Sequence, residues 1–416
     1  MNYTGENKER LIAFFEAGKT PPNQRKMGLE LEHIIVSKGT GKTVGYYDTK
    51  GIEYILQELS SYYENTTSYQ QHMIGLEREN NIVTLEPAGQ FEIALRPTAS
   101  IETAAKLYTS VLRELEPILE ALDYQMLNIG YHPKNNAREM PLIPKKRYQF
   151  MDQYFKTTGH HGIDMMRGSA STQVSLDYID EEDFINIFRL GNILCPLLAL
   201  LTDNTPYFMG RPYNGYLART VVWNDVDADR AMVVKDALNQ PFGFREYADY
   251  ILNSPAILIL DEEGTPKYTG ATPIKELYKD RPMTEAEIIH VLSMFFPDVR
   301  LKTYAEIRMA DSMPLPYALA YLALLKGLFY SNKNKTELLE QFQGIQDKDV
   351  KEAKETLIAN GYRSNIYGKT PKTLLLDLLN RAKEALAEAE KDYLRPFFDL
   401  VTEETTLAKS YNDSFA

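Results

Sequence analysis

The strongest constraint on the fold is an alternation of polar and apolar residues in four separate segments. In TYAEIRM, residues 303–309, Glu306 and Arg308 are separated by one apolar residue. Successive side chains of a β-strand point to opposite faces, so these charges would share one face and the alanine, isoleucine and methionine the other. The segment therefore predicts a strand with one apolar face and one face that carries opposite charges.

Three other segments, each far from the others in the sequence, alternate in the same way. Glu30 and Glu32 share a face in GLELEHI, and Gln173 lies on the polar face of STQVSLDY. In LEPAGQFEIAL, Glu86 precedes a predicted Pro-Ala-Gly turn and Glu92 follows it. If these strands belong to one sheet with their polar faces on the same side, several carboxylates converge.

Converging carboxylates raise one another's pKa, and a hard divalent cation removes that conflict. Mg²⁺ prefers oxygen ligands and usually retains phosphate oxygens, so the pattern suggests ATP bound through magnesium. The run SKGTGKT, residues 37–43, does not supply a phosphate-binding P-loop, because Val36 stands where the motif needs glycine and no helix is expected to follow. The alternative is that each polar face simply meets solvent, as in most half-exposed antiparallel sheets.

Basic residues that can bind carboxylates or phosphates are also spread along the chain. They are Lys145, Lys146, Arg147, Arg167, Arg219, Arg230, Arg300 and Lys302. The planar fork of arginine suits bidentate contact with either anion. Arg167 and Arg219 have apolar or small neighbours in the sequence, which makes them the better candidates, whereas any single one of the others is more often a surface charge.

Composition limits the classes of molecule that the protein is expected to bind and the cellular compartment in which it is expected. A net charge of −12 and a pI near 5.2 argue against nucleic acid and anionic membranes. Cys195 is the only cysteine, so no intrachain disulfide exists, and its apolar neighbours predict a buried thiol. The apolar run 190–202 is too short to cross a bilayer, and the first ten residues lack a signal core. We therefore expect a soluble cytoplasmic protein, for which a homo-oligomer is possible.

The periodicity of apolar residues and the positions of turn-forming residues divide the chain into a region of strands and helices and a region of helices alone. Extended segments are predicted at 27–37, 44–51, 80–97, 166–178 and 299–311. Ser100 is placed to cap a long helix. From residue 316 onward the pattern is nearly all helical, with a leucine stripe that would pack on the rest of the protein. The segments 1–315 and 316–416 are expected to form one compact unit, because no linker separates them.

In their order along the chain, several stretches resemble the glutamate–cysteine ligase family, in the plant and proteobacterial branch of the carboxylate–amine ligases. The stretches that carry the resemblance are GLELE, LEPAGQFEIALRP, NIGYHPK, PLIPKKRYQFMDQYF, MMRGSASTQVSLDY, ARTVVWNDVDADR, FGFREYADYIL and FPDVRLKTYAEIRMADSMP. They lie within residues 27–315, whereas residues 316–416 match only as a helical region.

The resemblance implies an α+β fold with a curved, mainly antiparallel sheet that forms a funnel-shaped active site, and with helices outside. It also implies an ATP-dependent ligase that phosphorylates the γ-carboxylate of glutamate and joins it to the amine of cysteine, the first step of glutathione-type thiol synthesis. Two or three Mg²⁺ ions would bridge the nucleotide phosphates and the substrate. Small molecules are thus the expected partners, and neither nucleic acid nor a membrane is expected.

Residue by residue, the resemblance assigns roles to the polar faces of the predicted strands. The metal ligands that it implies are Glu30, Glu32, Glu86, Glu92 and Glu306. Glu306 and Arg308 would be catalytic, with Arg308 meeting a phosphate or the acyl phosphate. The substrate-binding residues that it implies are Arg167, Gln173 and Arg219. The residues expected to contact the nucleotide are Arg300 and Lys302.

Three departures from the family pattern bear on the substrates. Ala88-Gly89 replaces a usual pair of glycines, the stretch Gly168–Ser171 lacks the usual threonines, and ADSMP replaces a glycine-rich ending. The first two lie near where the substrates would bind, so the identity of the amine stays open. Two alternatives are retained: a ligase that joins glutamate to a different amine, and a non-catalytic nucleotide-binding homologue.

Overall fold

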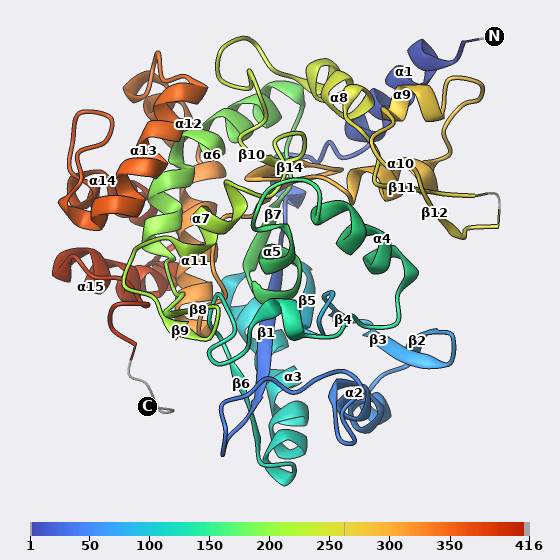
Figure 1. The fold of residues 1–416 in the computed structure, drawn as a ribbon. Helices are drawn as coiled ribbons and strands as arrows, with labels where there is room; N and C mark the ends of the chain where they lie inside the picture. The colour runs from blue at the N-terminus through green and yellow to red at the C-terminus, as the bar shows by residue number, and fades with distance from the viewer. Residues whose placement is uncertain (1, 262, 412–416) are drawn as a thin grey trace.

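A large antiparallel sheet organises the molecule, with helices packed around it (Figure 1). The computed structural model describes residues 2–261 and 263–411. The nine-stranded sheet has the order β14-β15-β7-β1-β5-β4-β3-β2, and β6 pairs with β1 beside this path. Its strands are β1 (Met27–Ser37), β2 (Asn65–Tyr69), β3 (His72–Arg78), β4 (Asn81–Leu85), β5 (Phe91–Thr98), β6 (Tyr124–Leu127), β7 (Thr172–Leu176), β14 (Val299–Leu301) and β15 (Ala305–Ile307). The predicted α+β class with a mainly antiparallel sheet is confirmed.

The register of the central strands decides which polar side chains meet. Glu32 of β1 lies opposite Glu92 of β5, and Glu30 of β1 lies opposite Gln173 of β7. Glu306 of β15 faces the next polar position along β7. Because side chains alternate across a strand, these five residues lie on one face of the sheet, and the aliphatic residues between them form the other.

The strand predicted at 27–37 is confirmed with the same bounds, and two strands flank the Pro-Ala-Gly turn as predicted. The segment 44–51 is predicted to form a strand and a turn; the strand is wrong, whereas the turn is confirmed. The Asp48 carboxylate accepts the Gly45 N–H at 2.7 Å. This local side-chain bond satisfies a backbone donor that a strand would use in a ladder.

Two further predictions change in detail. The extended segment predicted at 166–178 begins later, since α5 (Gly162–Gly168) occupies its start. The single strand predicted at 299–311 is a tight hairpin of β14 and β15. The hairpin places Arg300 directly opposite Glu306, so a cation from one short strand faces a carboxylate from the next.

Helices and short strand pairs complete the described structure. The helices are α1 (Thr4–Glu16), α2 (Ile52–Leu59), α3 (Ile101–Ala121), α4 (Lys146–Phe155), α6 (Glu181–Leu201), α7 (Ala218–Trp223), α8 (Phe244–Asn253), α9 (Ile274–Leu277), α10 (Glu285–Leu292), α11 (Leu315–Phe329), α12 (Asn332–Gln341), α13 (Asp347–Asn360), α14 (Pro371–Ala385) and α15 (Arg395–Glu403). The short strands are β8 (Tyr207–Phe208), β9 (Arg211–Pro212), β10 (Ala231–Met232), β11 (Leu258–Leu260), β12 (Pro266–Tyr268) and β13 (Phe296–Pro297). The predicted Ser100 cap is confirmed, because its hydroxyl accepts the Thr103 N–H at 3.3 Å.

One hydrophobic core holds the sheet and the helices together. α3 packs on β5, α6 packs on β14 and β15, and α11 packs on β1. The C-terminal helices α12, α13 and α14 in turn contact α6. Aliphatic residues from both sides of residue 315 therefore belong to the same buried cluster. This packing favours our expectation of one compact unit, which we keep as a proposal.

α6 is the most apolar long helix of the described residues and carries Cys195, which is buried as predicted. By length and composition alone it is able to cross a membrane. However, 83% of its most apolar window is buried inside the protein. The core helix of a globular domain has the same composition, so α6 is weak evidence for a membrane span.

Gly191 allows α6 to approach the β14–β15 hairpin, and this contact is testable. A methyl group at this position would lie 2.8 Å from Val299 Cγ2 and 3.3 Å from Ile307 Cδ1. We expect Gly191→Ala to lower the free energy of unfolding by about 1–3 kcal/mol through overpacking, even though alanine favours a helix. Chemical denaturation measures the change. The control is Gly5→Ala in α1, where nothing lies within 4 Å of the new methyl group. A Gly191→Ala protein as stable as the parent would contradict the close approach.

Candidate active site

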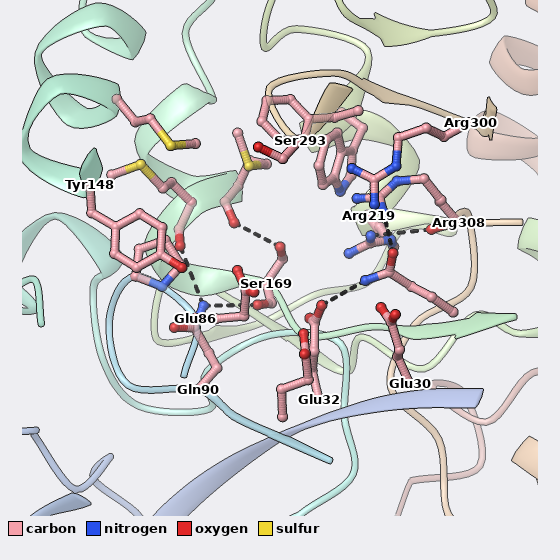
Figure 2. Close-up of a pocket in the computed structure, with 18 of the residues that line it drawn as sticks. Glu30, Glu32, Glu86, Gln90, Tyr148, Ser169, Arg219, Ser293, Arg300 and Arg308 are labelled. Atoms are coloured by element: carbon pink, nitrogen blue, oxygen red, sulfur yellow. Dashed lines mark hydrogen bonds between the residues drawn. The ribbon is translucent and has the colours of Figure 1, made fainter. Parts of the chain in front are cut away.

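A cavity lies over the polar face of the sheet, where the central strands meet α4, α5, α7 and the β14–β15 hairpin (Figure 2). Of the residues singled out in the sequence, those that line it are Glu30, Glu32, Glu86, Glu92, Arg147, Gln173, Arg219, Arg300, Lys302 and Arg308. The remaining lining residues are Pro87, Gln90, Tyr148, Met151, Met165, Met166, Ser169, Trp223, Ser293 and Phe296. Side chains from distant parts of the sequence thus converge on one site.

Glu32, Glu86 and Glu92 form the acidic group of this cavity. One carboxylate oxygen from each lies within 4.8 Å of the others. Glu32 accepts the Ser171 N–H at 2.7 Å and an amide hydrogen of Gln173 at 2.9 Å. Glu92 accepts a hydrogen bond from the Thr84 hydroxyl of β4 at 2.6 Å. These neutral donors hold Glu32 and Glu92 in place without adding positive charge.

The electrostatics of the acidic group fit a hard cation. Burial raises the pKa of Glu32, Glu86 and Glu92, and the neighbouring carboxylates raise the pKa of Glu86 and Glu92 further. Ionised carboxylates offer only acceptor oxygens, which are the ligands that Mg²⁺ prefers. A divalent cation would remove the repulsion that the sheet register imposes, so these three residues are the candidate metal ligands of the cavity.

Glu30 lies on the arginine side of Glu32 (Figure 2) and is not part of the acidic group found among the described residues. Burial raises the pKa of its carboxyl to about 7, and the charges of Glu92 and Glu306 contribute to the shift. Its predicted role as a metal ligand stays a prediction. Its position between negative and positive side chains makes it the group that responds most directly to the charge of a bound ligand.

Glu306 is the centre of a cationic group. Its Oε2 lies 2.6 Å from Arg300 Nη2 and 2.6 Å from Arg308 Nη1, and its Oε1 lies 3.5 Å from Lys302 Nζ. Burial opposes ionisation, but these cations outweigh it and hold the pKa of Glu306 well below its ordinary value. The carboxylate therefore orients three cations. Its predicted role as a metal ligand stays a prediction, since its Oε1 accepts no hydrogen bond among the described residues.

Arg219 completes the cationic end of the cavity. Its Nη2 donates to the Arg308 carbonyl at 3.3 Å, and its guanidinium lies 5.0 Å from the centre of the Trp223 ring. Its Nε and Nη1 are buried without a partner among the described residues, as are the Nε atoms of Arg300 and Arg308. Buried donors without partners cost stability unless a ligand satisfies them. The arrangement is suited to binding a carboxylate or a phosphate.

Arg167 does not reach the cavity. Its guanidinium forms an ion pair with Asp152 of α4 and donates to the Met140 carbonyl at 2.6 Å. These contacts join α4 and α5 to the loop that precedes them. Its position therefore does not support the expectation that Arg167 binds substrate, and small neighbours in the sequence were a poor guide to its surroundings.

Several residues of the cavity wall cannot be found from the alternation of residues in strands, because they lie on helices and loops. Arg147 of α4 donates to the Ser293 hydroxyl and carbonyl, both at 2.8 Å, and the described residues give it no ion pair with a carboxylate. Tyr148 lies beside Glu86 (Figure 2), and Met151, Met165 and Met166 also line the cavity. The only signal for these four residues in the sequence is that they lie within the stretches that carry the family resemblance, whereas Arg147 is also one of the basic candidates.

Gln90 links two parts of the site. Its Oε1 accepts the Ala88 N–H at 3.0 Å, and its Nε2 donates to the Ser169 carbonyl at 3.0 Å. It therefore ties the turn between Glu86 and Glu92 to the segment that leads into β7. This buried amide adds a second link between the acidic group and the β7 segment, beside the direct hydrogen bond from Gln173 to Glu32.

Comparison with known proteins gives a consistent result. The chain matches the model of glutamate–cysteine ligase family 2 over residues 26–402. It is 27% identical over 386 residues to glutamate–cysteine ligase B, chloroplastic, of Oryza sativa subsp. japonica, covering 91% of this chain and 77% of that protein. It is 28% identical over 387 residues to glutamate–cysteine ligase, chloroplastic, of Arabidopsis thaliana, covering 91% of this chain and 73% of that protein.

A solved structure shares the fold. It is the crystal structure of a glutamate–cysteine ligase from Francisella tularensis in complex with AMP, with a TM-score of 0.56 and 11% sequence identity. The match covers 93% of this chain and 84% of that chain. At this level of identity the likeness concerns the fold alone.

The pKa of Glu30 predicts a pH-dependent stability. A carboxyl whose pKa rises from an ordinary 4.5 to about 7 in the folded protein binds more protons folded than unfolded between these values. Its contribution is fully present below pH 4.5 and is lost as the pH rises through 7. Without divalent cations, we expect the parent to lose about 3 kcal/mol relative to Glu30→Gln over this interval. Denaturation at several pH values measures the difference, and a difference independent of pH would contradict the assignment.

Proposed function

The chain belongs to glutamate–cysteine ligase family 2, and on that premise we propose that it uses ATP to join the γ-carboxylate of L-glutamate to the amine of L-cysteine. The observation that carries the proposal is the division of one cavity into an acidic group and a cationic group. The acidic group suits a metal ion, and the cationic group suits the anionic substrates. A ligase that brings ATP and an amino-acid substrate together needs both.

The acidic end would hold magnesium. Glu32, Glu86 and Glu92 are the residues whose oxygens approach one another closely enough to share an ion. When bound there, magnesium would neutralise charge on the nucleotide phosphates and polarise them toward nucleophilic attack. We keep the expectation of two or three ions as part of the proposal, with Glu30 beside the acidic group as the further carboxylate within the cavity.

The cationic end would bind and orient the anions that react. Among the described residues, two buried donors of Arg219 have no partner, which suits the α-carboxylate of glutamate. Arg308, held by Glu306 at 2.6 Å, would meet the phosphoryl group as it leaves ATP. Arg300 and Lys302 contact the same glutamate and would contact the nucleotide phosphates. Fixed cations of this kind stabilise the charge that develops in phosphoryl transfer without reorganising.

The reaction then follows in two displacements. A γ-carboxylate oxygen of glutamate attacks the terminal phosphorus of ATP, which forms an acyl phosphate and releases ADP. The amine nitrogen of cysteine attacks the acyl carbon, the amide bond forms, and phosphate and a proton leave. Water would hydrolyse the acyl phosphate, so the apolar wall of Tyr148 and three methionines, with Trp223 and Phe296 opposite, would protect it.

Arg147 supports an amino acid as the second substrate. Its guanidinium lines the cavity beside the methionine wall, and its described partners are the hydroxyl and carbonyl of Ser293, which carry no charge. A carboxylate on the amine substrate would supply the missing negative charge, whereas ammonia or a simple alkylamine would not. The adjacent sulfur-rich wall would accommodate a thiol side chain. The cytoplasmic location expected from the sequence stays a prediction.

Product analysis tests the reaction directly. With ATP, Mg²⁺ and L-glutamate, we expect phosphate release that depends on L-cysteine, and mass spectrometry should identify γ-glutamylcysteine. L-2-aminobutyrate, L-alanine and ammonia form the comparison panel, since the first has nearly the shape of cysteine without its thiol. Turnover confined to another amine would support the other-amine ligase, and no turnover with any amine would support the non-catalytic homologue.

Magnesium dependence tests the acidic group. Because Glu92 is one of three carboxylates that approach one another, we expect Glu92→Gln to raise the Mg²⁺ concentration for half-maximal activity by about tenfold or more. The matched control is Glu77→Gln on β3, whose carboxylate pairs with Arg96 at the surface and should leave the magnesium requirement unchanged. Identical magnesium titrations for Glu92→Gln and the parent would rule out Glu92 as a ligand.

A further inference from the structure

A buried ion pair joins the C-terminal helices to the segment that carries the anion-binding arginines. Lys354 Nζ of α13 lies 2.5 Å from Asp298 Oδ2, and both side chains are almost fully shielded from solvent. Asp298 follows β13 and directly precedes β14. The pair therefore lies at the base of the hairpin that presents Arg300, Glu306 and the following Arg308 to the cavity.

Asp298 is also a neighbour of two arginines. It lines a small pocket with Arg219 and Arg308, and this pocket shares both arginines with the main cavity. The Asp298 carbonyl accepts the Arg308 N–H at 3.0 Å. Burial lowers the pKa of Arg219, and the negative charges of Glu32, Asp311 and, to a smaller extent, Asp298 favour its ionised form. Among the described residues, however, the Asp298 carboxylate pairs with Lys354 and with neither arginine.

Three cations therefore compete for one carboxylate in surroundings of low dielectric. A buried carboxylate without a partner is strongly destabilising, so it will pair with whichever cation is available. Among the described residues, Arg219 and Arg308 both have buried donors without partners. Without the charge of Lys354, Asp298 would be a buried carboxylate without a cation that borders both arginines, and we expect it to compete with the substrate for them.

We propose that Lys354 is a positioning residue for substrate binding. By holding the Asp298 carboxylate, it keeps Arg219 and Arg308 free to bind a substrate anion. The inference rests on the proposed function, since it takes these arginines to bind substrate. Within the described chain, the residues that line the cavity all precede residue 316. α13 also packs on α7, which carries Arg219, but its charged contact with this region is the Lys354–Asp298 pair. The pair would give the C-terminal helices a part in ligand recognition.

The test is Lys354→Met, which keeps most of the side-chain volume and removes the charge. We expect KM for L-glutamate to rise about tenfold or more, with kcat within about threefold of the parent, because the arginines are sequestered but still present. The double variant Asp298→Asn/Lys354→Met also removes the competing carboxylate. Its KM should return to within about threefold of the parent, a rescue that loss of packing alone does not produce.

A matched control separates positioning from stability. Lys335 forms a similarly buried ion pair with Asp183 between α12 and α6, and neither residue is among those that line the cavity. Lys335→Met should lower the melting temperature without raising KM. An unchanged KM in Lys354→Met, or a double variant with a KM as high as that of the single variant, would overturn the proposal.

Two further measurements keep the proposal falsifiable. If Lys354→Met does not fold, Asp298→Asn serves as the test, because it has no carboxylate to compete for the arginines. Its KM for L-glutamate should equal that of the parent, and a tenfold rise would overturn the proposal. Calorimetric titration of the parent with L-glutamate, in the presence of Mg²⁺ and a non-hydrolysable ATP analogue, tests the premise. No binding and no turnover by the parent would be a failure of the proposed function, whereas an active parent with an unaffected Lys354→Met protein would be a failure of this inference alone.

Discussion

Carboxylates that face one another across adjacent strands are the constraint on which the site depends. Glu32 and Glu92 occupy opposed positions of β1 and β5, where side chains start about 5 Å apart. Glu86 joins them from the turn that follows β4. In a poorly solvated cavity such crowding disfavours ionisation. Repulsion between these carboxylates therefore destabilises the fold, and a bound cation would relieve it. The same repulsion would favour binding of the cation.

At the other end of the same sheet face positive charges are crowded, and a carboxylate of the protein itself reduces their repulsion. Glu306 contacts three cations and offsets part of their charge, so Arg300 and Arg308 can lie close together without an external anion. Among the described residues, the Nε atoms of Arg300 and Arg308 and two donors of Arg219 still lack partners. The strands thus present negative charge on β1 and β5 and net positive charge around β14, β15 and α7. A ligand that combines a metal with phosphates and a carboxylate would span both.

The hydrophobic core transmits these constraints to the rest of the chain. α6 packs directly on the β14–β15 hairpin, where Gly191 allows close approach, and the C-terminal helices pack on α6. Lys354 then reaches from α13 to Asp298 at the base of the hairpin. The last hundred residues carry little sequence signal for function, yet they pack on α6 and contribute one buried ion pair at the base of the hairpin that carries Arg300.

The sequence by itself determined the strands with an apolar face, the residues on their polar faces and the single buried thiol. Alternation of polar and apolar residues depends only on neighbouring positions in the sequence. It therefore predicts the strand at 27–37 and the strands around the Pro-Ala-Gly turn. β2 was missed because NTTSY is polar throughout and exposed at the sheet edge. Only the tertiary structure decided that Glu306 is neutralised by Arg300 across a hairpin, that Arg167 pairs with Asp152 away from the cavity, and that Arg147 reaches the cavity wall. The reason is physical: alternation fixes which side of a strand a residue occupies, but the charge that a carboxylate or guanidinium meets there depends on register and packing between segments that are distant along the chain.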